Sequence, residues 1–265
     1  MSAPLKEPPV YFVVAQVRFN PVLKLKDYVP AVQEALRRAG FPAFSTQRAL
    51  VVQLTMQDGQ PVPTQHAQER FKFGTTDRTH DLLLDAESIT LQSTKHNRFE
   101  EFAAKLISAL EIVHKEVGLD FTERVGVRYL DRVVPKSGET LQQYLDPHVL
   151  GLNFKLQTEL EASPTHSYSE SVCSIDGVLL RCRVVVQEGP ISFPPDLQPL
   201  DLQVDERLKA GDGIHAIIDT DGSLGGRNSF SLDDVNKQLH KIHGVIHNSF
   251  EKTATSHAFK VWGRQ

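Results

Sequence analysis

The sequence predicts an α+β fold in which curved antiparallel sheets are each covered on one face by a long helix. Roughly nine strand-like segments, joined mostly by short turns, indicate antiparallel pairing. Two long amphipathic helices are expected over 98–117 and 232–250, each after a strand. Moving the first helix by 133 positions (99 to 232) superposes the apolar positions of the two, which suggests two related units, residues 1–135 and 136–265, packed as one body. The alternative is that the two helices share this apolar spacing by coincidence, because both face the core.

In the first half, residue type and turn signals set the elements. Asp27 can cap a helix that ends at Gly40, and the helix over 98–117 ends at Gly118. The stretch 57–65 contains glycine and two prolines and is predicted to be a loop. Strands are expected over 10–19, 49–56, 69–74, 79–84, 88–93 and 123–134.

The second half contains one clear hairpin, over 166–175 and 178–187, because Asp176-Gly177 fits a two-residue turn. The proline-rich stretch 189–213 is expected to be an irregular surface excursion. A strand over 214–220 is followed by a glycine-rich loop, 222–227, and Ser231 can cap the last long helix.

Composition places the chain among ordinary globular proteins. The 265 residues carry 29 Lys and Arg against 33 Asp and Glu, a net charge of -4, which does not suggest a nucleic-acid coat protein. No run approaches the roughly 18 apolar residues of a membrane helix, and the first residues do not look like a secretory signal. Cys173 and Cys182 would lie diagonally across the hairpin and are expected to be free thiols. A cytoplasmic location without membrane contact is expected.

Several segments resemble, in order along the chain, an uncharacterised and sporadically distributed bacterial protein family. They are VRFNP (17–21), KDYVPAVQEALRRAGFP (26–42), SITLQSTKHNRFEEFAAKL (88–106), ERVGVRYLDRV (123–133) and LHKIHGVIHNSFEK (239–252). The resemblance implies a bacterial cytoplasmic protein encoded by an accessory gene, and such genes often belong to defence, toxin–antitoxin or mobile-element systems. It implies no activity and no catalytic residue.

Arginines form the first candidate site. Strand alternation places Arg124, Arg128 and Arg132 on one face of the strand over 123–134. Guanidinium groups bind phosphate or carboxylate through paired hydrogen bonds, so an exposed arginine-lined sheet face could hold an anion, a nucleic acid or an acidic partner. The alternative is a solvated face whose arginines pair with Asp77, Asp81, Asp131 and Glu170. The complete set proposed for anion or partner binding is Arg18, Arg124, Arg128, Arg132, Arg181 and Arg183.

Two weaker patterns involve histidine. His243 and His247 are four positions apart on a helix and could share a metal, although the glutamate of an H-E-x-x-H motif is missing. The cluster 95–98, Lys-His-Asn-Arg, precedes a long helix, where it could cradle an anion or simply cap the helix.

These observations favour a non-enzymatic protein that binds a protein partner, in an antitoxin, immunity or defence-regulating role. No catalytic residue is named and no cofactor is expected. One alternative is a nucleic-acid or nucleotide binder that uses the arginines, and another is a metal-assisted hydrolase that uses His243 and His247. An exposed edge strand would also allow a homo-oligomer.

Overall fold

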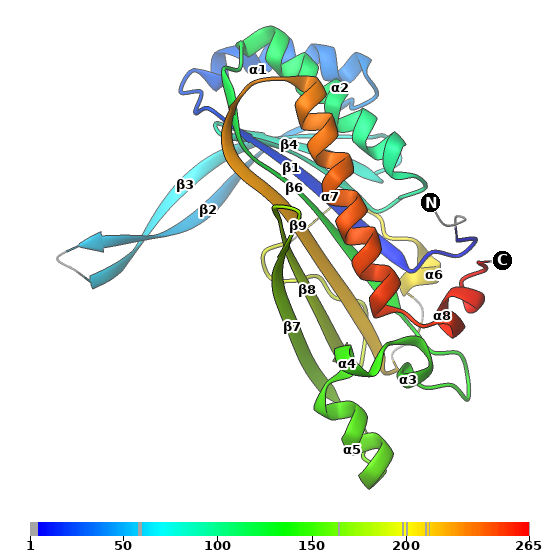
Figure 1. The fold of residues 1–265 in the computed structure, drawn as a ribbon. Helices are drawn as coiled ribbons and strands as arrows, with labels where there is room; N and C mark the ends of the chain where they lie inside the picture. The colour runs from blue at the N-terminus through cyan, green and yellow to red at the C-terminus, as the bar shows by residue number, and fades with distance from the viewer. Residues whose placement is uncertain are drawn as a thin grey trace.

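The strands form one continuous antiparallel sheet of nine, in the order β2-β3-β4-β5-β1-β6-β9-β8-β7 (Figure 1). This computed structural model describes residues 5–57, 60–163, 165–197, 199, 201–209, 211 and 213–264, and for 48–57 and 60–68 the backbone alone. The strands are β1 (Val10–Phe19), β2 (Ala43–Gln57), β3 (Gln60–Gly74), β4 (His80–Asp85), β5 (Ser88–Ser93), β6 (Phe121–Val133), β7 (His166–Ile175), β8 (Val178–Gln187) and β9 (His215–Ser229). The prediction of two separately covered sheets is therefore wrong, because β6 pairs with both β1 and β9 and joins the halves.

Three helices pack against one face of this sheet. Side chains of α1, α2 and α7 share a single apolar core with the strands, and Figure 1 shows α7 crossing the middle of the sheet. We call this side of the sheet the helix face. The helices are α1 (Leu25–Arg38), α2 (Phe99–Val117), α3 (Leu141–Tyr144), α4 (Pro147–Leu150), α5 (Leu152–Leu160), α6 (Glu206–Lys209), α7 (Leu232–Thr253) and α8 (Ser256–Val261).

The segment between β8 and β9 covers part of the opposite face. The ring of Phe193 meets Tyr11 and Phe12 of β1 edge-on, with 5.3 Å between ring centroids in both pairs. The hydroxyl of Tyr11 donates a hydrogen bond to the backbone oxygen of Ser192 at 2.7 Å. The prediction of irregular structure here is confirmed apart from the single turn of α6, but the segment buries apolar surface instead of projecting into solvent.

The strongest local signals are confirmed. Gly118 ends α2 in the left-handed conformation, and the Ser231 side chain accepts a hydrogen bond from the backbone N–H of Asp234 at the start of α7. The hairpin turn has positive φ at both Asp176 and Gly177, as a type I′ turn requires.

Two predicted loops are wrong. Strand β3 begins at Gln60 and pairs with β2 along its length, so the stretch 57–65 is mainly strand. The glycine-rich stretch 222–227 is also strand, within β9. A Cβ on Gly222 would lie 2.8 Å from Ile242 and 3.2 Å from Ile246, so the glycine lets α7 pack closely on the sheet.

Among the helices of the described part of the chain, none combines the length and the apolar character needed to cross a membrane.

Candidate functional site

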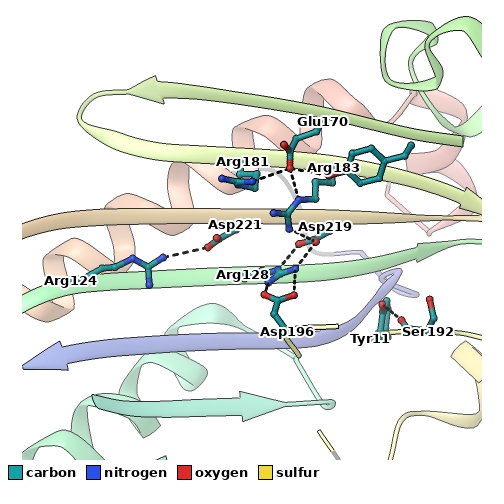
Figure 2. Close-up of polar contacts among 11 residues, drawn as sticks. Tyr11, Arg124, Arg128, Glu170, Arg181, Arg183, Ser192, Asp196, Asp219 and Asp221 are labelled. Atoms are coloured by element: carbon teal, nitrogen blue, oxygen red, sulfur yellow. Dashed lines mark hydrogen bonds and ion pairs between the residues drawn. The ribbon is translucent and has the colours of Figure 1, made fainter. Parts of the chain in front are cut away.

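The arginines of β6 lie on the face opposite the helices, and Arg128 is held there by two aspartates (Figure 2). Its Nε and Nη2 donate to the two carboxylate oxygens of Asp219 at 2.6 and 2.7 Å. Its Nη1 donates to Asp196, in the segment that covers this face, at 2.5 Å. Arg128 is 7% exposed, so this ion pair is buried and leaves little of the guanidinium for a guest.

The other two β6 arginines differ from Arg128 and from each other. Arg132 is 2% exposed and donates to the backbone oxygens of Leu208 and Gly211 at 2.6 and 2.7 Å. Arg124 lies 4.0 Å from Asp221 with a partly exposed side chain (Figure 2). The expectation of an open face therefore does not hold at Arg128 and Arg132, because the segment between β8 and β9 covers them.

The remaining three predicted arginines are also paired. Arg183 and Arg181 donate to the same Glu170 oxygen at 2.6 and 3.1 Å. Hydrogen bonds from Arg183, from the Tyr168 hydroxyl and from Arg181 lower the pKa of Glu170 to about 2. Arg183 also reaches Asp219 at 3.0 Å, so it joins the Arg128 network (Figure 2). Arg18 pairs separately with Glu87 at 2.8 Å. Positive and negative groups alternate across this face, which is the arrangement of an internally compensated surface. An anion-binding role for the six arginines stays a prediction.

The two histidines proposed as metal ligands make other contacts. The ring of His243 stacks on Phe99 of α2 with 4.0 Å between centroids, and Nε2 of His247 lies 3.5 Å from Glu251. Within the described residues, no cluster of three or more His, Cys, Asp or Glu side chains could hold a metal ion. We therefore take the metal hypothesis no further.

His243 instead forms part of a pocket on the helix face, which we call the α2–α7 pocket. The cavity has a volume of about 440 Å³ and lies over β6 and β9 between the start of α2 and the second half of α7. The basic cluster predicted at 95–98 contributes part of this wall. The lining residues are Leu5, Pro8, Pro9, Val10, His96, Asn97, Arg98, Phe99, Glu100, Tyr129, Asp131, Thr220, His243, Ile246, His247, Phe250 and Arg264.

A tyrosine hydroxyl links two histidines in this pocket. The Tyr129 oxygen lies 3.4 Å from Nε2 of His96 and 3.2 Å from Nδ1 of His243. Burial lowers the pKa of each histidine to about 4, so both rings are neutral at pH 7. Burial also raises the pKa of Tyr129, which keeps the phenol protonated as a hydrogen-bond donor. The three side chains are therefore an uncharged hydrogen-bonding group.

The sheet beneath this group contains polar atoms without partners. Asp131 is 6% exposed, and among the described residues its carboxylate has no hydrogen-bond or ion-pair partner. Burial alone raises the pKa of Asp131 to about 7. Thr220, on the neighbouring strand, is 1% exposed with an unpartnered Oγ1, and Nδ1 of His96 is also buried and unpartnered. Folded proteins leave few such groups unsatisfied, so two buried unpartnered atoms next to a carboxylate without a partner indicate a binding site.

The sequence singled out parts of this wall, the 95–98 cluster and the two histidines, as separate candidates, but it did not indicate the sheet floor. One alternative paired Asp131 with the arginines, yet its odd-numbered position places it with Val127 and Tyr129 on the helix face. The available signal was a carboxylate in an otherwise apolar alternation. Tyr129 and Thr220 carried no signal of their own, because the pairing of β6 with β9 brings them together.

A scan against protein-family models and a search of curated proteins each found no match to this chain. The expected family membership and protein partner therefore stay predictions.

Proposed function

We propose that this protein binds a small organic molecule in the α2–α7 pocket. The observation that carries the proposal is a pair of buried, unpartnered atoms, Thr220 Oγ1 and His96 Nδ1, beside the Asp131 carboxylate, which has no partner among the described residues, around one cavity. A buried polar group without a partner destabilises a fold by roughly 1–3 kcal/mol, and a ligand that pairs with it removes that penalty. The proposal keeps the binding role favoured by the sequence and changes the bound species from a protein to a small molecule.

The walls support a ligand with both apolar and polar parts. Phe99, Ile246 and Phe250 supply apolar surface from the two helices, and Val10 closes the pocket from β1. Ligand sites are typically apolar cavities of about 300–1,000 Å³ with a few converging polar groups. The α2–α7 pocket, at about 440 Å³, has that composition and a size that suits a compound with one ring.

Binding of benzyl alcohol, measured by protein-observed NMR titration, tests this proposal. We expect saturable shifts centred on the pocket, with a dissociation constant of about 1 mM or tighter for a ligand of this size. Tryptophan at a lining position fills the cavity, so Val10→Trp and Asn97→Trp should each weaken binding by about tenfold or more.

The matched control is Val172→Trp on the exposed face of β7, which should bind like the wild type. Asn97 is itself exposed, so its replacement is a safer test of pocket filling than that of the partly buried Val10. Thermal unfolding of each variant checks that the fold is retained. Binding that is unchanged in a folded Asn97→Trp protein, or no saturable binding by the wild type, would overturn the proposal.

A further inference from the structure

The polar floor of the α2–α7 pocket carries one ionisable acid and no fixed positive charge. Asp131 on β6 is the only carboxylate on the sheet side of the cavity among the described residues, and its position leaves it without a partner. The nearby imidazoles of His96 and His243 are neutral at pH 7 because burial lowers the pKa of both. A ligand that enters this space therefore meets a hydrogen-bond acceptor with negative charge.

Two arginines, Arg98 and Arg264, line the edge of the pocket, and Arg264 is paired with an acid. Arg264 forms two hydrogen bonds with Glu251, at 2.9 and 2.6 Å, and its guanidinium lies 3.7 Å from the centroid of Phe259. The positive end of α2 is accompanied by Glu100 and Glu101 in its first turn. Arg98 is exposed at the start of α2, and the sheet residues that line the pocket include no basic side chain, so the positive charges lie at the edge and the negative charge of Asp131 lies on the floor.

Aromatic walls complete an environment that suits a cation. Phe99, Tyr129 and Phe250 line the cavity together with Asp131. Ring faces attract organic cations, and a buried carboxylate adds a charge-assisted hydrogen bond. Thr220 Oγ1 and His96 Nδ1 offer further sites for the N–H groups of a ligand.

We propose, on the basis of the binding function above, that the ligand of the α2–α7 pocket carries a primary amine or amidine whose cationic head pairs with the Asp131 carboxylate, with its apolar body between Phe99 and Phe250. The pairing satisfies the buried acid, and the rest of the pocket accommodates one ring or a short aliphatic chain. An alcohol of equal size lacks the charge, and a carboxylate would be repelled by Asp131.

Calorimetric titration at pH 8 with benzylamine, benzyl alcohol and phenylacetate tests the inference. The first two probes are matched in shape, so their difference reports the charge of the head group. We expect benzylamine to bind the wild type roughly tenfold or more tightly than benzyl alcohol, and phenylacetate to bind weakest. Asp131→Asn should remove the amine preference, measured as the ratio of benzylamine to benzyl alcohol affinity within the same variant. Asp120→Asn, an exposed aspartate that does not line the pocket, is the matched control and should behave like the wild type.

The outcomes separate this inference from the function beneath it. Equal binding of amine and alcohol, or an amine preference that survives Asp131→Asn, overturns the amine assignment and leaves a small-molecule pocket. Stronger binding of phenylacetate also overturns it. Binding of none of the three probes overturns both proposals.

Discussion

Replacing Asp131 by asparagine should stabilise the protein, and by an amount that depends on pH. Burial raises the pKa of Asp131 from 3.8 to about 7. This difference of roughly three units corresponds to about 4 kcal/mol, since each unit is worth about 1.4 kcal/mol. Because the folded-state pKa is the higher one, the folded protein binds the proton more tightly than the unfolded chain does. The wild type therefore loses stability as pH rises from 4 through 7.

Asparagine has no such ionisation, so the two proteins diverge with pH. At pH 5, ionisation of this carboxyl stabilises the unfolded wild type relative to the folded state by about 1.5 kcal/mol. Above pH 8 this stabilisation of the unfolded state approaches about 4 kcal/mol. Asp131→Asn should therefore become more stable relative to wild type by about 1.1 kcal/mol per pH unit on average between pH 5 and 7. The buried amide adds a penalty of its own, but that penalty is the same at every pH, so the slope is the informative quantity.

Urea unfolding at pH 5, 6, 7 and 8, followed by the fluorescence of Trp262, measures this slope. The titration of His96 and His243 is common to both proteins and cancels from the difference. Asp120→Asn, at an exposed position, should show no comparable slope. A stability difference between Asp131→Asn and wild type that stays flat from pH 5 to 8 would refute the claim that Asp131 is buried and unpartnered.

Two further predictions concern the arginine network and the packing of α7. Arg128→Ala removes one of the two arginines that hold the buried Asp219, and it should lower the free energy of unfolding by about 3 kcal/mol or more. Arg124→Ala removes a pair that is 4.0 Å apart and partly exposed, and it should cost less than about 1 kcal/mol; equal losses in urea unfolding would show that the buried network is not special. Gly222→Ala places a Cβ 2.8 Å from a side chain of α7 and should lower the free energy of unfolding by about 1–3 kcal/mol. The control Gly225→Ala meets nothing within 4 Å, and its free energy of unfolding should stay within about 0.5 kcal/mol of wild type. Similar losses of stability for the two variants in thermal unfolding would contradict the packing argument.

Local signals in the sequence predicted local structure well. The end of α2 at Gly118, the start of α7 at Ser231 and the Asp176-Gly177 turn each depend on one or two residues and on backbone geometry. The pairing of Cys173 with Leu180 and of Cys182 with Ser171 followed from that turn, and both cysteines are free thiols. Such features need no knowledge of distant contacts.

Features that depend on distant partners could not be predicted. A glycine-rich stretch after a strand usually indicates a loop, but Gly222 belongs to β9 because α7 packs on it. A proline-rich stretch indicates irregular backbone and gives no information about where that backbone lies. The contact of Phe193 with Tyr11 and Phe12 arises only when the chain folds back across β1.

The two faces of β6 show why charge alone is a poor guide to the site. The face with Arg124, Arg128 and Arg132 was conspicuous in the sequence, yet its charges meet acids or backbone oxygens within the same chain. The opposite face contributes one buried acid, Asp131, which has no hydrogen-bond or ion-pair partner among the described residues. A compensated network stabilises a fold without a ligand, whereas an uncompensated buried acid lowers stability and needs a reason to be kept. The unpaired carboxylate beneath α7 is therefore a better guide to a binding site than the six paired arginines.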